Sequence, residues 1–208
     1  MNRLSQFRLK PTQTHLFAAQ HVLQYLATTC DYRLTYGKDD STELIGYSDS
    51  DWGADTDDHH STSGYIYVLS GGSVTWATQK QCTISLSSTE AEYMALTDCT
   101  KHAQWTLSLL RQLDFEVNIP LSVYCDSTGA QAIAVNSVFH KRTKHIDIRY
   151  HYICEVINDG IVDIQDIGAD DNTADLLTKL MTCNQHEFLS KKTGLINGQI
   201  EGKCSKTQ

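Results

Sequence analysis

The stretch SSTEAEYMAL, residues 87–96, places Glu90 and Glu92 at the predicted start of a long helix. Ser87 and Glu90 have the spacing of a capping box, in which a serine and a glutamate three residues later bind free backbone N–H groups. On a helical wheel of about 100° per residue, Glu92 lies on the apolar stripe and Glu90 on a more polar side. Burying a carboxylate is costly unless a cation or hydrogen bond compensates it. The geometry therefore favours Glu92 as the functional glutamate and Glu90 as a structural one.

The elements on either side of this helix predict an α/β fold. Three β-rich stretches joined by short turns precede the helix, which indicates an antiparallel meander. Two later strands alternate with helices, which indicates crossover connections. We therefore expect a mixed five-stranded sheet, three antiparallel strands and then two crossover strands, with helices on both faces. The predicted strands are 43–52, 64–70, 73–79, 121–126 and 161–167, and the predicted helices are 88–113, 127–135, one ending near 158 and one beginning at 172.

The two ends of the chain differ from this central region. Residues 1–38 carry an excess of four positive charges, and 12–29 predicts a helix with one apolar stripe. One such helix cannot form a core alone, so we expect it to dock on a partner or on a second copy of the chain. Residues after Gly194 are polar and expected to be loose. The predicted organisation is an N-terminal segment 1–38, a main domain 43–196 and a flexible tail 197–208.

Composition narrows the classes of function. A net charge of −8 argues against a protein that coats nucleic acid non-specifically, although a nuclease site needs carboxylates to hold cations. The seven cysteines form no CxxC pair and no zinc-ligand spacing, which indicates reduced thiols in an intracellular protein. The apolar runs are only a few residues long, so no membrane-spanning segment is predicted.

Further acids occupy positions where predicted strands and helices end. Asp49 and Asp51 lie in phase with apolar positions of the first strand, Asp126 ends the fourth strand, and Asp175 opens the last predicted helix. Each has an ordinary alternative, which is solvation at a strand end for the first two and helix capping for the others. Grouped with Glu92, they would repel one another unless divalent cations lie among them. Oxygen-only ligation selects Mg²⁺ or Mn²⁺, and two such ions about 3.5–4 Å apart can drive phosphodiester cleavage.

The order of elements and acids resembles the ribonuclease H fold. Several strings resemble, in the same order, the ribonuclease H region of copia-type (Pseudoviridae) LTR retrotransposon polyproteins. The resemblance covers 43–196, and residues 11–37 resemble the end of the preceding reverse transcriptase. The matching strings are GYSDSDWGAD, STSGYIYVLSGGSVTWATQKQ, SLSSTEAEYMAL, VYCDSTGAQAI, RTKHIDIRYHYI and NTADLLTKL.

The resemblance implies a metal-dependent endonuclease. The family's four metal-binding acids fall on Asp49, Glu92, Asp126 and Asp175, with Asp51 as an auxiliary, so the family pattern and the helical wheel select the same glutamate. With two Mg²⁺ ions, or Mn²⁺ in their place, such an enzyme hydrolyses the RNA strand of RNA–DNA hybrids during reverse transcription. The resemblance also implies the polymerase domain of the same polyprotein as a partner and a cytoplasmic virus-like particle as the location.

The sequence departs from the family pattern at three points. Many relatives have DWAGD followed by an arginine where this chain has DWGADTDDHH (51–60), and an asparagine where it has Ser127. Neither change removes a proposed ligand. Cellular and retroviral ribonucleases H have a histidine before the last acid that helps product release, whereas no histidine lies between Asp163 and Asp175. We expect this absence to affect turnover rather than chemistry.

A basic stretch precedes the predicted helix that ends near residue 158. Phosphate neutralisation by lysine and arginine is the main source of nucleic-acid affinity, so beside a carboxylate site we expect this stretch to grip an RNA–DNA hybrid. The alternative is a solvated helix start. The proposed nucleic-acid-binding residues are Lys141, Arg142, Lys144, His145 and Arg149.

Two other functions stay open at the level of sequence. A catalytically inactive or domesticated remnant would keep the fold and the affinity for hybrids, although a binding module has no use for clustered acids. An integrase-like nuclease on the same fold would need a different set of acids.

Overall fold

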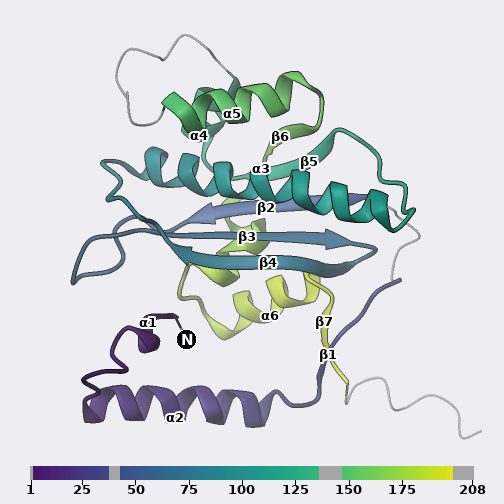
Figure 1. The fold of residues 1–208 in the computed structure, drawn as a ribbon. Helices are drawn as coiled ribbons and strands as arrows, with labels where there is room; N and C mark the ends of the chain where they lie inside the picture. The colour runs from purple at the N-terminus through teal and green to yellow at the C-terminus, as the bar shows by residue number, and fades with distance from the viewer. Residues whose placement is uncertain (1, 38–42, 136–146, 199–208) are drawn as a thin grey trace, which may run out of the picture.

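The computed structural model describes residues 2–37, 43–135 and 147–198, with side chains described from Leu4 and, in the last range, from Tyr152. A five-stranded sheet forms its centre, in the order β4-β3-β2-β5-β6 (Figure 1). The first three strands pair antiparallel and the last two continue the sheet in parallel, so the predicted mixed sheet is confirmed. The strands are β2 (Leu44–Ser50), β3 (Thr62–Leu69), β4 (Gly72–Lys80), β5 (Leu121–Cys125) and β6 (Val162–Asp166).

Helix α3 (Ser88–Gln112) crosses one face of the sheet, together with α4 (Thr128–Val135) and α5 (Asp147–Asn158) (Figure 1). The side chain of Ser87 accepts a hydrogen bond from the Glu90 N–H at 3.1 Å, which caps the start of α3. The apolar stripe of α3 and the facing side chains of the strands form the core. Its largest fully buried side chains include Leu44, Tyr67, Tyr93, Leu96, Leu121, Val123 and Ile153.

The opposite face is covered by the 3₁₀ helix η3 (Thr173–Leu177) and by α6 (Cys183–Lys192), so helices lie on both faces as predicted (Figure 1). Gly64 in β3 allows this close packing, because a Cβ there would lie 2.9 Å from Leu177 Cβ and 2.8 Å from Thr178 Cγ2. The fully buried Asn172 donates a hydrogen bond to the Ser48 carbonyl at 3.0 Å. These contacts hold the segment that follows Asn172 against the end of β2.

The prediction that the last helix begins at residue 172 is wrong. Residues Thr173–Leu177 form only a short 3₁₀ helix, after a similar turn at η2 (Ala169–Asp171), and α6 begins at Cys183. Thr182 marks that start, since its side chain accepts a hydrogen bond from the Gln185 N–H at 3.4 Å. Long-range contacts of the segment with β2 and β3 outweigh its local helical pattern.

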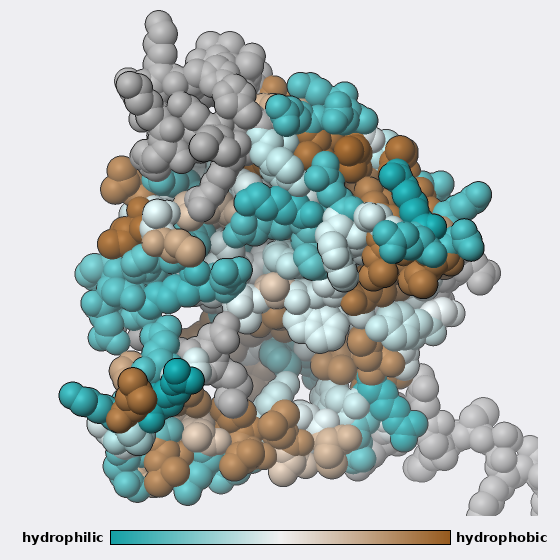
Figure 2. Space-filling model, viewed as in Figure 1, coloured by the Kyte–Doolittle hydropathy of each residue, from teal (hydrophilic) through white to brown (hydrophobic). Residues whose placement is uncertain are grey.

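The N-terminal segment confirms its predicted helix, α2 (Gln13–Thr28), which follows the short α1 (Asn2–Ser5). Thr12 caps α2, and its N–H donates to His15 Nδ1 at 3.0 Å. No residue of α2 is buried, and Figure 2 shows apolar side chains along it at the bottom of the view. The described residues contain no helix that is both long and apolar enough to cross a membrane. The exposed apolar side chains of α2 include Leu16, Phe17, Leu23, Tyr25 and Leu26.

A second, two-stranded sheet was not predicted. β1 (Tyr32–Leu34) pairs antiparallel with β7 (Leu195–Asn197), so the region expected to be loose after Gly194 begins with a paired strand. Thr35 reinforces the pairing, since its N–H and its Oγ1 both donate to the Gly194 carbonyl at 2.9 Å. The N-terminal segment is therefore tied to the end of the main domain.

Candidate active site

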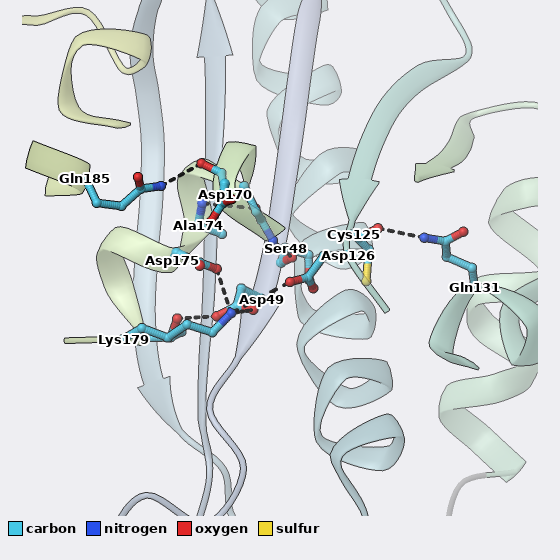
Figure 3. A network of polar contacts seen from close by, with 12 residues as sticks. Ser48, Asp49, Cys125, Asp126, Gln131, Asp170, Ala174, Asp175, Lys179 and Gln185 are labelled. Atoms are coloured by element: carbon cyan, nitrogen blue, oxygen red, sulfur yellow. Dashed lines mark hydrogen bonds and ion pairs between the residues drawn. The ribbon is translucent and has the colours of Figure 1, made fainter. Parts of the chain in front are cut away.

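The carboxyl ends of β2 and β5 bring distant acids to one edge of the sheet. The two strands are parallel and pair Ser48 with Cys125, so Asp49 and Asp126 follow as neighbours. Carboxylate oxygens of Asp49, Asp126 and Asp175 lie within 4.8 Å of one another, and Figure 3 shows the three side chains converging. Oxygens of Glu92 and Asp126 form a second group, within the same distance, with the Cys125 sulfur. The structure thus gathers the four predicted acids from four separate elements.

Asp49 is the most deeply buried acid of the site, with a side chain that is 0% exposed. Its Oδ1 accepts a hydrogen bond from Lys179 Nζ at 2.9 Å, and its Oδ2 accepts one from Thr178 Oγ1. Burial raises the pKa of Asp49 to about 6, with Asp175 adding to the increase, while the bonds from Thr178 and Lys179 oppose it. Both oxygens of Asp49 therefore already have donors.

Glu92 projects from the first turns of α3 toward the same edge and is 9% exposed. Burial and the charges of Asp49 and Asp126 raise the pKa of Glu92 to about 8, although Lys179 and a backbone hydrogen bond from Ser50 lower it. Its buried Oε2 has no hydrogen-bond partner among the residues that the structure describes. A buried carboxylate oxygen without a donor is costly, and a cation would compensate it.

Asp126 and Asp175 do not serve as the helix caps that the sequence left open for them. Ser127 caps α4 by accepting a hydrogen bond from the Ala130 N–H at 3.2 Å, and Asn172 caps η3 by accepting one from the Ala174 N–H at 3.2 Å. Burial raises the pKa of Asp175, while its hydrogen bond from Lys179 opposes the increase. Both carboxylates are thus available to the cluster.

Sequence reasoning missed Lys179, which is the cation of this cluster. Its Nζ lies 2.9 Å from Asp49 Oδ1, 2.9 Å from Asp175 Oδ1 and 3.7 Å from Asp126 Oδ2 (Figure 3). Burial works to lower the pKa of Lys179, but the hydrogen bonds and charges of Asp175 and Asp49 raise it further than burial lowers it. A lysine four residues after a proposed acid was the available signal, since this spacing brings two side chains to the same side of a helical turn.

Asp51 and Glu90 have local structural contacts. Asp51 Oδ1 accepts a hydrogen bond from the Thr62 N–H at 2.8 Å, across the connection between β2 and β3. Glu90 Oε2 accepts one from the Leu86 N–H at 2.8 Å, just before α3. Neither acid belongs to the two groups found among the described residues. The auxiliary role of Asp51 stays a prediction.

The predicted nucleic-acid-binding stretch lies largely outside the described residues. This applies to Lys141, Arg142, Lys144 and His145. Arg149 lies in α5, but its side chain is outside the described part of the chain. Their contact with nucleic acid stays a prediction.

Comparison with known proteins identifies relatives along nearly the whole chain, although no model of a known protein family matches it. The chain is 39% identical over 196 residues to the retrovirus-related Pol polyprotein from transposon RE2 of Arabidopsis thaliana. It is 37% identical over 192 residues to the corresponding polyprotein from transposon TNT 1-94 of Nicotiana tabacum. The alignments cover 94% and 92% of this chain and 14% of each relative.

Among solved structures, the chain is similar to LC11-RNase H1, which was crystallised in complex with an RNA/DNA hybrid. The two share 17% identity with a TM-score of 0.47, over 65% of this chain and 93% of that one. The sequence relatives match this chain from the N-terminal segment into the main domain. The homologues of this chain are copia-type retrotransposon Pol polyproteins, and the chain spans 14% of the length of these two relatives.

Proposed function

We propose that this chain is the ribonuclease H of a retrotransposon reverse transcriptase, an endonuclease that hydrolyses the RNA strand of RNA–DNA hybrids. The observation that carries the proposal is the cluster of Asp49, Glu92, Asp126 and Asp175 at one sheet edge, with a buried Glu92 oxygen that has no donor in the described part of the chain. Family membership supports it, since removal of the RNA strand accompanies reverse transcription. Four clustered acids have no evident use in a module that only binds.

The chemistry of the cluster fits Mg²⁺, with Mn²⁺ as a substitute. The donor set consists of carboxylate oxygens, which these hard cations prefer. Cys125 is not a good ligand, because burial raises the pKa of its thiol well above the ordinary value and keeps it protonated. When bound, a pair of such ions would supply an activated water and stabilise the leaving oxygen of the scissile phosphate.

The secondary-structure elements fix the positions of the four carboxylates. Asp49 and Asp126 extend from neighbouring parallel strands, so the sheet fixes their separation. Glu92 comes from the capped and buried start of α3, and Asp175 from η3, which Asn172 ties to β2. We propose that these four carboxylates hold both ions and that the products carry 5′-phosphate and 3′-hydroxyl ends.

We propose two binding partners, the RNA–DNA hybrid and the polymerase domain of the same polyprotein. The basic stretch that contains Lys141, Arg142, Lys144, His145 and Arg149 would hold the phosphates of the hybrid. The exposed apolar stripe of α2 would contact the polymerase domain of the same polyprotein, within a cytoplasmic virus-like particle. A dimer of the isolated chain in gel filtration would instead support self-association through that stripe.

The test is incubation of the full chain with a labelled RNA–DNA hybrid in Mg²⁺ or in EDTA. We expect cleavage of the RNA strand in Mg²⁺ only, and loss of cleavage in Asp126→Asn. Asp159→Asn is the matched control, because Asp159 lies in the exposed turn after α5, and it should cleave like the wild type. Tight binding of the hybrid without cleavage would refute the enzyme and support an inactive remnant.

A further inference from the structure

Lys179 occupies the centre of one half of the candidate site. We call Asp49 and Asp175 the aspartate half, and Glu92 with Cys125 the glutamate half, while Asp126 lies between them. The ammonium of Lys179 is within 2.9 Å of both acids of the aspartate half. Among the described side chains, no other lysine or arginine forms an ion pair with these acids.

In the aspartate half, each carboxylate oxygen of Asp49 already accepts a hydrogen bond. Lys179 holds Oδ1 and Thr178 holds Oδ2. Lys179 also holds Asp175 Oδ1 at 2.9 Å. An ion that takes Asp49 and Asp175 as ligands must therefore share or replace these contacts, because an ammonium and a metal ion repel each other at a shared carboxylate.

The side chain of Lys179 can rotate away from the aspartate half into solvent. It is 37% exposed, whereas its partner Asp49 is fully buried. A lysine has a flexible four-carbon stem and a strongly hydrated head, so rotation toward solvent restores the hydration of the ammonium. The carboxylate of Asp49 has no such route, and it stays in place whichever cation compensates it.

We propose that Lys179 is an exchangeable counter-ion of the aspartate half, which holds Asp49 and Asp175 together in the metal-free protein and is displaced when a divalent ion binds. This inference rests on the proposed metal site and adds a competitor to it. Lys179 is then not a metal-positioning residue, and the two roles predict opposite changes in metal affinity when Lys179 is removed. Removal of a competitor strengthens metal binding, whereas removal of a positioning residue weakens it.

The experiment measures Mn²⁺ affinity of the full chain through the electron paramagnetic resonance signal of free Mn²⁺. Lys179→Met removes the ammonium and keeps a similar apolar stem, and we expect its dissociation constant for Mn²⁺ to fall at least about tenfold. Lys179→Arg keeps the charge, and we expect an affinity equal to or weaker than that of the wild type. Lys191→Met is the matched control, because Lys191 forms a similar i,i+4 ion pair with Glu187 at 2.9 Å on the surface of α6, and it should bind like the wild type.

Thermal unfolding in EDTA and in saturating Mn²⁺ gives a second readout. We expect Lys179→Met to melt below the wild type in EDTA, since its acids lose their counter-ion, and to gain more than the wild type when Mn²⁺ is added. An equal or weaker Mn²⁺ affinity in Lys179→Met would overturn the inference, and so would a much tighter affinity in Lys179→Arg. If Lys179→Met does not fold, Lys179→Gln, which also removes the charge, carries the same expectation of a lower dissociation constant for Mn²⁺.

Cleavage of the hybrid by the wild type separates this inference from the proposed function. If the wild type cleaves in Mg²⁺ but Lys179→Met binds Mn²⁺ no more tightly, the inference falls and the function stands. If Lys179→Met binds Mn²⁺ more tightly and the wild type does not cleave, the inference stands without the nuclease. If neither protein binds Mn²⁺, both are wrong.

Discussion

The two halves of the candidate active site differ in how their charges are compensated. In the aspartate half, Asp49 and Asp175 share the ammonium of Lys179, and Thr178 donates to the remaining oxygen of Asp49. In the glutamate half, Glu92 Oε2 is buried with no donor among the described residues. The pKa of Asp49 accordingly rises to about 6 and that of Glu92 to about 8.

This difference shows that the uncompensated buried charge of the site lies mainly at Glu92. At Asp49, hydrogen bonds from Thr178 and Lys179 oppose the rise in pKa that burial causes. At Glu92, the charge of Lys179 and a backbone hydrogen bond from Ser50 oppose it, yet the pKa of Glu92 rises further above its ordinary value. The glutamate half is thus the part of the molecule that gains most from an added cation. The predictions below follow in order of expected effect.

The largest effect is expected from Glu92→Gln, which removes the charge of the glutamate half and preserves its shape. Mutation of a residue that only hydrogen-bonds a metal ligand typically costs about 10–100-fold in affinity or activity. Loss of a proposed ligand itself should therefore reduce hybrid cleavage at least about 100-fold. The rate of RNA-strand cleavage in Mg²⁺ measures this. Activity within about threefold of the wild type would remove Glu92 from the metal site.

The second prediction concerns the stability of the metal-free protein, which should fall as the pH rises. The folded pKa of Glu92, about 8, exceeds the ordinary 4.5, so the folded state holds a proton that the unfolded state has lost between these values. This destabilises the fold on the order of 4 kcal/mol at pH 8 relative to acid pH. Asp49 contributes a further loss of stability as the pH rises from 3.8 to about 6, because its folded pKa is also raised.

Urea unfolding in EDTA at pH 5 and pH 8 tests this dependence, with Glu92→Gln as the reference. The free energy of unfolding of the wild type should fall more steeply with pH than that of the variant, and saturating Mn²⁺ should flatten the wild-type curve. Parallel curves for the two proteins would show that Glu92 ionises normally in the fold.

A third prediction moves the aspartate half alone. Gly64→Ala would push a methyl group against Leu177 and Thr178, since the added Cβ would lie 2.9 and 2.8 Å from their side-chain carbons. We expect a loss of about 1–3 kcal/mol in the free energy of unfolding, with reduced cleavage because Asp175 and Lys179 shift with this segment. Gly168→Ala is the control, as its nearest neighbour, Asp171 Oδ2, would lie 3.9 Å away. Equal melting of the two variants would contradict the packing role of Gly64.

The sequence predicted the four acids better than the segment and the lysine around them, for a physical reason. The period of the long helix singled out Glu92, although the start of α3 is buried all round and Glu90, at 7% exposed, is as buried as Glu92 at 9%. Parallel strands bring Asp49 and Asp126 to one edge. The 3₁₀ helix at Thr173–Leu177 and the place of Lys179 depend on contacts with β2 and β3 more than 100 residues away in the chain. No local pattern encodes such contacts, nor the three-residue pairing of β1 with β7.

The smallest effect is expected from Glu90→Gln, two residues from Glu92. Glu90 accepts a hydrogen bond from the Leu86 N–H at 2.8 Å at the start of α3, and a glutamine oxygen can accept the same bond. The interaction of its charge with the helix N-terminus is lost, which costs about 0.3–1 kcal/mol. We therefore expect a slightly lower melting temperature, unchanged hybrid cleavage and unchanged Mn²⁺ affinity. If Glu90→Gln lost cleavage while Glu92→Gln kept it, the cation site would be assigned to the wrong glutamate, because a carboxylate oxygen without a donor among the described residues would then not mark the ligand.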